Sequence, residues 1–448
     1  MTRYSKERFR QGSQARKWNR LTGDTVSTEQ RVSTTASRRG NKPILIQPLT
    51  LAAAARNGSL DALSIVRLAL AATVILSHSW PLGGFGHDPT LPGTDITLGT
   101  MAVVGFLSLS GFLVTLSLER LTAPRFIWHR VLRIMPAYWT CLLVIALVLA
   151  PTIWWFSGSP GDAYWSQNPA PASFVSANFL LNQQQFGIGS IFAANPYGTV
   201  IDGSLWSLIY EFLCYLGLVA LALICAFRQL RGRLFAFLVA SVALWSGVVS
   251  TTYLVNDVSP AQAGGVSLPL IGEVYLIYLM PLTFAFCCGS LLALGARYVS
   301  VSYQLIIGSI VALAVGIVWP AAHYLLVVPA LSLLLLVSGM VIRGEFVGWF
   351  RRNDGSYGTY LYGFPIQQTL VFAGVSTALG PYGLAALAFA FAYPLGLLSW
   401  WCIERPALRL KDKQIRSPRR PSGQPFSQTN TNSLYAKTLP TERGNGKE

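Results

Sequence analysis

An arginine and a histidine interrupt the first long apolar stretch of the chain. Arg67 and His78 belong to SIVRLALAATVILSHSW, residues 64–80, which otherwise suits a lipid environment. On an α-helix, a separation of eleven residues returns the second side chain to almost the same face, roughly 16 Å further along the axis. Ionisable groups are costly inside a bilayer and are functional candidates by default. We interpret the two residues as two points on one path through a membrane protein.

His78 is a candidate general base, because imidazole titrates near neutral pH and can take a proton from a hydroxyl nucleophile. It could equally be a packing residue or a member of a proton relay. An acidic candidate, Glu211, shares a helix face with Ser207 and Tyr215, which lie four residues to either side. Glu211 either orients the histidine, as the third member of a catalytic triad does, or forms a buried pair with Arg67 or another cation.

A group of arginines precedes a later apolar segment, in RFIWHRVLRIMPAY, residues 125–138. Arg130 and Arg133 are three residues apart on one helix face, with Arg125 upstream and Tyr138 downstream. Guanidinium groups bind phosphate in a bidentate manner, so the cluster is a candidate anion site. Arginines also anchor the cytoplasmic connections of membrane proteins, and this alternative explains the cluster without a ligand.

The composition indicates that membrane-spanning helices position these residues. Of 448 residues, 52% are hydrophobic and 12% are charged, whereas soluble proteins carry about 25% charged residues. We count about ten apolar runs of spanning length and predict an all-α polytopic membrane protein. The segment 269–295 contains Glu273 and Pro281, so a kinked or broken helix is expected there. The predicted spans are 60–80, 98–118, 134–156, 203–227, 234–254, 269–295, 303–319, 322–342, 356–378 and 382–403.

Along the chain, predicted connections that contain lysine or arginine alternate with predicted connections that contain neither. The basic connections are separated by connections that contain neither residue: 81–97, 157–202, 255–268, 320–321 and 379–381. This pattern predicts that both termini are cytoplasmic. It also accounts for the formal net charge of +16, so no nucleic acid partner is expected.

The polar, basic ends of the chain differ from its apolar middle. Residues 1–57 and 411–448 lack a sustained apolar period and are expected to be disordered cytoplasmic tails, with one transmembrane domain over 58–410. The connection 157–202 is polar and aromatic, which suits either a sugar ligand or a position at the membrane interface. The six cysteines lie in apolar stretches and are expected to be small buried residues, with no disulfide or metal site.

Six short motifs follow one another between residues 59 and 410. They are Arg67 with His78, Ser110-Gly111-Phe112, Arg130-x-x-Arg133 continued by Ile134, Pro136 and Tyr138, Trp206-Ser207 with Glu211, SYGTYLYGFP at 356–365, and CIERP at 402–406. In this order they resemble the membrane-bound acyltransferase family 3. Members of that family are O-acyltransferases that modify cell-envelope polysaccharides and related glycans.

The resemblance implies a multi-pass enzyme of a bacterial inner or plasma membrane. It would transfer an acyl group, by default acetyl, from cytoplasmic acyl-CoA to a hydroxyl of a carbohydrate or lipid-linked glycan of the envelope or of an exported polysaccharide. Acyl-CoA would be a donor substrate and not a resident cofactor. The resemblance implies an acyl-CoA site at Arg130, Arg133, Arg125 and Tyr138, and an acceptor site at Trp206 and Ser207.

The same resemblance assigns catalysis to His78, Arg67 and Glu211. His78 would be the general base, and Arg67 would steer the donor or stabilise charge on the thioester oxygen. Many relatives have a histidine where this chain has Gly363. We therefore expect that position not to be the universal base, with the nearby glutamines at 367 and 368 supplying hydrogen bonds.

Two alternatives remain open from the sequence. One is a catalytically silent relative, which the Gly363 departure allows. The other is a proton-coupled exporter or translocator of a glycan or lipid-linked glycan, which would use His78, Arg67 and Glu211 as a relay.

Overall fold

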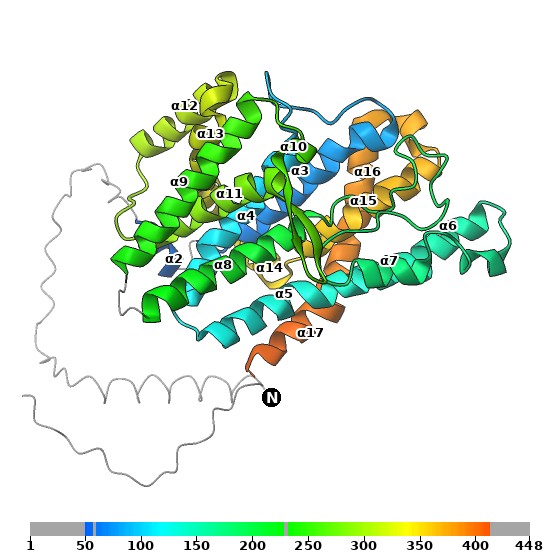
Figure 1. The fold of residues 1–448 in the computed structure, drawn as a ribbon, viewed down its shortest axis with the longest axis horizontal. Coiled ribbons are helices and arrows are strands. Elements are labelled where there is room, and N and C mark those ends of the chain that lie inside the picture. The colour runs from blue at the N-terminus through cyan, green and yellow to red at the C-terminus, as the bar shows by residue number, and fades with distance from the viewer. Residues whose placement is uncertain (1–49, 57–59, 228–231, 413–448) are drawn as a thin grey trace, which may run out of the picture. The chain divides into compact units, whose positions relative to one another are not determined.

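The computed structural model describes residues 50–56, 60–227 and 232–412, so the predicted tails lie outside the described residues except at their inner ends. The described chain is mostly helical and contains almost no sheet (Figure 1). Eight of its helices are long and apolar enough to cross a membrane. The predicted all-α polytopic membrane fold is therefore confirmed.

Each of the ten predicted spans contains a long helix. Two of these, α12 with 16 residues and α15 with 17, are shorter than the eight candidate spans. The helices are α3 (Leu63–Gly83), α4 (Leu98–Leu118), α5 (Ala123–Val144) continued by η1 (Ile145–Leu149) and α6 (Ala150–Phe156), α8 (Ser207–Phe227), α9 (Arg233–Val255), α11 (Leu276–Leu294), α12 (Tyr303–Val318), α13 (His323–Val341), α15 (Ser356–Phe372) and α16 (Val375–Ser399).

Short elements complete the described chain. The helical ones are α2 (Leu51–Arg56), η2 (Gly161–Tyr164), α7 (Pro171–Ala177), α10 (Pro260–Ala263), η3 (Pro320–Ala322), α14 (Glu345–Arg352), η4 (Trp400–Glu404), α17 (Arg405–Leu408) and η5 (Arg409–Asp412). The strands β1 (Gly265–Leu268) and β2 (Gly272–Tyr275) form an antiparallel hairpin.

The hairpin corrects the prediction for one span. Residues 269–275 form its turn and second strand, and do not begin a kinked helix. Glu273 lies opposite Ser267 in the hairpin, so it is not inside a membrane-spanning helix as predicted. Gly265 and Gly272 in the two strands and Pro269 in the turn all disfavour a helix here. Pro281, in contrast, does lie within α11.

A second difference concerns the N-terminal tail. Residues 51–56 form α2, although the prediction placed them in a disordered segment. Leu51 and Ala54 are fully buried, and the Leu51 N–H donates to the carbonyl of Val299 at 3.0 Å. Packing and backbone hydrogen bonding thus extend the folded domain beyond the first long apolar run.

Two glycines set the contact between the central helices α4 and α11. A Cβ atom at Gly111 would overlap the carbonyl oxygen of Phe286, and one at Gly289 would overlap that of Ser108. Small residues let helix backbones approach closely in membrane proteins. The third member of the motif Ser110-Gly111-Phe112 is fully buried, so the motif serves packing at two of its three positions.

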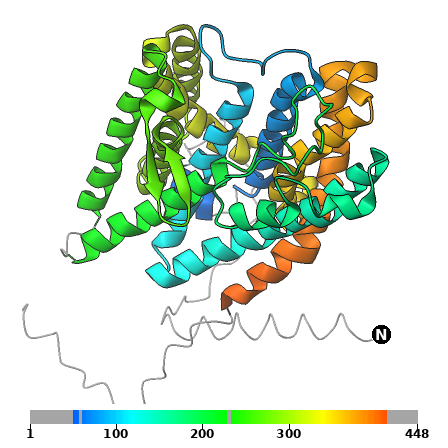
Figure 2. The same ribbon diagram turned by 45° about the vertical axis from the view of Figure 1, so that its right-hand side comes forward.

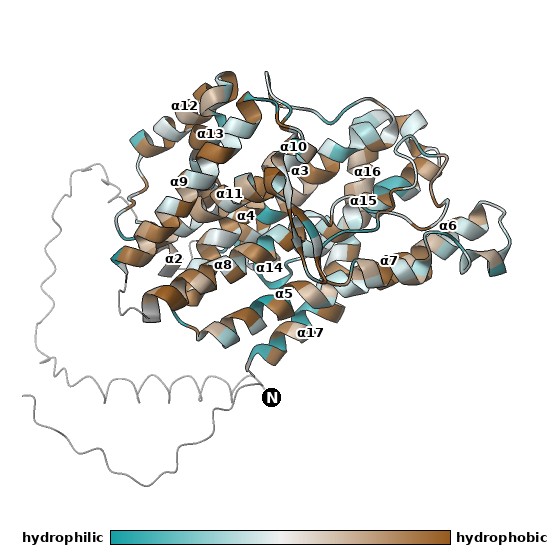
Figure 3. Ribbon diagram, viewed as in Figure 1, coloured by the Kyte–Doolittle hydropathy of each residue, from teal (hydrophilic) through white to brown (hydrophobic). Residues whose placement is uncertain are grey.

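Large apolar side chains cover the outer surface of α9. Phe237, Leu244 and Trp245 are each at least 60% exposed, and Figure 3 shows brown residues along this helix. Exposed apolar surface of this kind marks a contact with lipid. The teal residues of α17 contrast with it, as expected for an element that follows the last span.

The connections gather at two opposite ends of the helices. We call the end with residues 119–122, 295–302, 342–355 and 404–412 the arginine end. The end with residues 84–97, 157–206 and 256–275 is the loop end, where the Asn182 amide donates to the Ile271 carbonyl at 2.8 Å. Figures 1 and 2 both show α17 crossing beneath α5 at the arginine end. The predicted alternation of connections is therefore seen in space.

A buried carboxylate anchors the connection 157–206. Oδ1 of Asp202 accepts hydrogen bonds from the N–H and the hydroxyl of Ser204, both at 2.8 Å. Oδ2 has no partner among the described residues. Burial raises the pKa of Asp202 to about 7, although the Ser204 hydrogen bonds oppose this shift.

We predict that this connection makes the fold more stable near pH 5 than near pH 8. Between an unfolded pKa of about 3.9 and the folded value, the folded protein binds more protons than the unfolded chain, so stability falls as pH rises. Thermal midpoints across this range measure the effect. Asp202→Asn should remove this contribution, and Asp162→Asn, in the exposed turn η2, should retain it. Identical pH profiles for wild type and Asp202→Asn would contradict the assignment.

Candidate functional site

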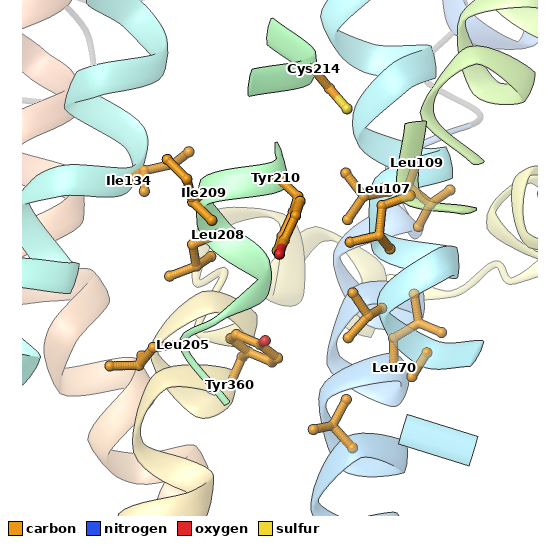
Figure 4. Packing of buried hydrophobic residues seen from close by; sticks show 14 of the residues in the cluster. Leu70, Leu107, Leu109, Ile134, Leu205, Leu208, Ile209, Tyr210, Cys214 and Tyr360 are labelled. Carbon is orange, nitrogen blue, oxygen red and sulfur yellow. The ribbon is translucent and has the colours of Figure 1, made fainter. Parts of the chain in front are cut away.

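A cavity lies between α3, α4, α5, α8 and α15, and we call it the central cavity. Its volume is about 120 Å³. Figure 4 shows part of its apolar wall, where Leu107, Ile134, Leu208 and Tyr360 converge from four of these helices. The polar residues that line it are Arg67, Ser110, Arg130, Arg133, Ser207, Glu211, Tyr215, Ser356, Tyr357 and Tyr360.

The cavity brings together five of the residues singled out from the sequence. Arg67, Arg130 and Arg133 line it from α3 and α5, and Ser207 and Glu211 from α8. The predicted helix face of Ser207, Glu211 and Tyr215 is confirmed, since all three point into the same space. Residues from segments far apart in the chain thus share one site.

Glu211 is held by hydroxyl groups. Its Oε1 accepts hydrogen bonds from Ser110 on α4 and Tyr215 on its own helix. Among the described residues it has no cation within ion-pairing distance, and its partners do not include His78. The guanidinium of Arg130 lies 6.0 Å from the centre of the Tyr215 ring, and its Nε has no described partner. Tyr215 therefore lies next to both Glu211 and Arg130.

Four charged residues form a neutral cluster beside the cavity, which we call the charge quartet. Oδ2 of Asp354 accepts from Arg67 at 2.6 Å and from Arg133 at 3.1 Å. Arg133 also donates to Glu404 of η4 at 2.9 Å. Asp354 and Glu404 are 8% and 1% exposed, so the arginines compensate two buried negative charges. Burial opposes ionisation of Asp354, but Arg67 and Arg133 lower its pKa below its usual value.

His78 lies outside the central cavity and has its own acidic neighbour. Its Nδ1 is 3.4 Å from Oδ1 of Asp88, which also accepts a hydrogen bond from Ser77 at 2.8 Å. Its ring meets Phe364 edge-on, with the centres 5.6 Å apart. Asp88, and not Glu211, is therefore the carboxylate positioned to orient this imidazole.

Two helices show how far His78 is from the cavity. On α4, Gly99 is next to His78 and Val103 lines the cavity. On α15, Phe364 contacts His78 and Tyr360 lines the cavity. Four residues of α-helix correspond to about 6 Å, so His78 lies about one turn beyond the cavity, toward the loop end.

Gly363, where the resemblance led us to expect a histidine, is a packing position. A Cβ atom at Gly363 would lie 2.8 Å from Cγ1 of Ile75, so α3 and α15 approach closely there. One turn further on, the Gln367 amide donates to the Ile75 carbonyl and to the Ser79 hydroxyl, both at 2.7 Å. Gln368 bonds instead to Asn195 and Val200 of the connection 157–206.

Trp206 lines a different space, which we call the aromatic cavity. This cavity of about 220 Å³ lies among the loop ends of α4, α8, α9, α11 and α13. Trp206, Tyr253, Tyr278 and Tyr324 supply rings, and Asp95 and Asp257 supply carboxylates. The adjacent Ser207 lines the central cavity, so the start of α8 separates the two spaces.

Two residues of the predicted acyl-CoA set do not line the central cavity. Tyr138 is fully buried, and its hydroxyl donates to the Asn178 carbonyl at 2.6 Å. It therefore fastens α5 to the connection 157–206. Arg125 lies on the exposed first turn of α5, two turns before Arg133.

Sequence reasoning missed Asp88 and Asp354. Asp354 is 287 residues from Arg67, so no periodic pattern connects them. A signal did exist, because an arginine inside an apolar span requires a counter-charge, and Asp354 stands immediately before an apolar helix. Asp88 lies in a connection that carries no lysine or arginine, which left it without an evident partner.

We predict that Asp354→Asn strongly destabilises the protein. It leaves Arg67 and Arg133 without a shared carboxylate, and breaking such a buried pair costs about 3–5 kcal/mol. Asp61→Asn is the control, because its pair with Arg351 is exposed on both sides and contributes at most about 1 kcal/mol. Thermal midpoints in detergent compare the two variants, and equal losses would contradict a special role for the quartet.

Two known proteins and one protein family match most of this chain. An O-acetyl transferase of Shigella phage Sf6 is 27% identical over 349 residues, which are 76% of this chain and 93% of that protein. Nodulation protein 10 of Rhizobium leguminosarum bv. viciae is 28% identical over 374 residues, 80% of this chain and 96% of that protein. No solved structure matches the chain significantly. Residues 60–405 match the family model described as an acyltransferase domain, and this multi-pass membrane protein therefore belongs to acyltransferase family 3.

Proposed function

We propose that this acyltransferase moves an acetyl group from acyl-CoA to a hydroxyl group of a carbohydrate, either in the cell envelope or in an exported polysaccharide. The observation that carries the proposal is the convergence of three arginines and Glu211 on one cavity, with His78 one turn beyond it. The arginine end faces the cytoplasm of a bacterial cell in this proposal, in keeping with the distribution of basic residues.

The size of the central cavity supports a short acyl group. Its volume of about 120 Å³ corresponds to roughly four water molecules. It can hold an acetyl group and its thioester, but a long hydrocarbon chain would not fit. The name of the phage relative, an O-acetyl transferase, agrees with this choice.

Charge at the cavity suits an anionic donor that enters from the arginine end. Arg67 and Arg133 are compensated by the quartet, whereas Arg130 has no carboxylate partner among the described residues. Arg67 and His78 are roughly 16 Å apart along α3, so they do not act on the same carbonyl oxygen. We therefore assign Arg67 to steering the donor, and not to stabilising charge on the thioester.

His78 is the general base in this proposal. Asp88 lies 3.4 Å from Nδ1, which leaves Nε2 to take the proton of the acceptor hydroxyl. The hydroxyl oxygen attacks the thioester carbonyl carbon and forms the ester bond as the carbon–sulfur bond breaks. The leaving thiolate then takes the proton from the imidazolium, which restores neutral histidine.

The aromatic cavity is the candidate acceptor site. Rings pack on the apolar faces of sugars, and the carboxylates of Asp95 and Asp257 accept hydrogen bonds from sugar hydroxyls. The first two turns of α4 contact the candidate base and both cavities. Gly99 lies beside His78, Thr100 and Val104 line the aromatic cavity, and Val103 lines the central cavity.

We predict that His78→Ala abolishes acyl transfer while leaving the protein folded. Loss of a general base lowers the rate by about 10²–10⁴-fold. Base-labile acyl groups on envelope and secreted glycans are compared between cells that lack the protein and cells restored with wild type, His78→Ala or Arg67→Ala. Membrane levels of the protein are matched.

His87→Ala is the matched control, since His87 is exposed and precedes Asp88 directly. It should restore the ester as wild type does. If His78→Ala restored the ester fully, His78 would not be the general base. If no ester appears even with wild type, the translocation alternative gains support.

A further inference from the structure

A large cavity lies apart from the central cavity, at the arginine end. Its volume is about 1260 Å³, and it is bordered by α2, the end of α4, the start of α5, the start of α9 and the end of α11. We call it the basic vestibule. It is large enough for a nucleotide, whereas the central cavity is not.

Three arginines give the basic vestibule its charge. Arg120, Arg233 and Arg297 line it together with a single carboxylate, Glu119. All three arginines are exposed, and none forms an ion pair with a carboxylate of the described residues. Uncompensated guanidinium groups are suited to phosphate.

An aromatic ring stands beside one of these arginines. The guanidinium of Arg297 lies 4.6 Å from the centre of the Tyr298 ring, and Tyr298 is 73% exposed. An exposed ring next to a cation offers a stacking surface for a purine base close to a site for its phosphates. The vestibule therefore combines the two features that recognise a phosphorylated nucleoside.

The basic vestibule adjoins the central cavity. Leu113 lines both spaces. On α5, His129 faces the vestibule and the next residue, Arg130, faces the central cavity. Leu113 and Arg130 thus stand at the boundary that a long, thin substituent of a nucleotide in the vestibule would cross to reach the central cavity.

We propose that the basic vestibule binds the nucleotide end of the acyl-CoA donor. Its phosphates contact Arg120, Arg233 and Arg297, its adenine stacks on Tyr298, and the pantetheine arm carries the acyl group past Leu113. The proposal rests on acyl-CoA being the donor. This placement differs from the site expected from the sequence, which included Arg133. The charge of Arg133 is already compensated by Asp354 and Glu404.

The first test measures binding and needs no activity. Adenosine 3′,5′-bisphosphate is titrated into the full chain in phosphatidylcholine nanodiscs. Arg233→Gln and Arg297→Gln should each weaken binding by about tenfold, the loss of one charge-assisted contact. Arg343→Gln is the control, because Arg343 is exposed at the same end but does not line the vestibule. Unchanged affinity in both test variants overturns the proposal, as does absence of nucleotide binding in wild type, which would leave anionic lipid headgroups as the ligand.

The second test separates this proposal from the proposed function. Transfer is measured with acetyl-CoA and with S-acetylpantetheine, which lacks the nucleotide. Arg297→Gln should raise KM about tenfold for acetyl-CoA and leave KM for the short donor unchanged. Equal effects on both donors would overturn the vestibule proposal. If wild type uses neither donor, the proposed function fails, and the binding titration still decides whether the vestibule takes a nucleotide.

Discussion

Neutralisation of two buried carboxylates by two partly exposed arginines holds together the part of the structure on which the rest depends. The quartet joins α3, α5 and η4 to the segment before α15, so it fixes the floor of the central cavity. In a membrane protein these charges are tolerated because each has a partner of opposite sign. The same pairing leaves Arg130 as a lining arginine with no carboxylate among the described residues.

The helix α4 divides the interior into functional compartments. Gly111 holds it against α11, while Gly99 lies beside His78, Thr100 lines the aromatic cavity and Val103 lines the central cavity, all within about one turn. In the function proposed above, this partition keeps the donor and the acceptor apart until their reacting groups meet at one position. The start of α8 completes the partition, because Trp206 and Ser207 lie on opposite sides of it.

Local patterns predicted the helices and some of the site. Apolar runs of spanning length located ten helices, and a spacing of four residues placed Ser207, Glu211 and Tyr215 on one face. Such patterns describe one helix at a time, so they could not identify Asp354 as the partner of Arg67 or assign Asp88 to His78. They also misread 269–275, since an apolar run that contains Pro269 and Gly272 is compatible with a hairpin.

The close contact at Gly363 limits which side chains this position can accept. Any side chain there meets Ile75, which is itself buried on α3 beside the carbonyl that binds Gln367. A smaller residue at position 75 would have to come first, and the reverse order would pass through an overpacked intermediate. The glycine is therefore protected by its neighbour, because a larger residue at position 363 becomes accessible only after a second substitution, at position 75.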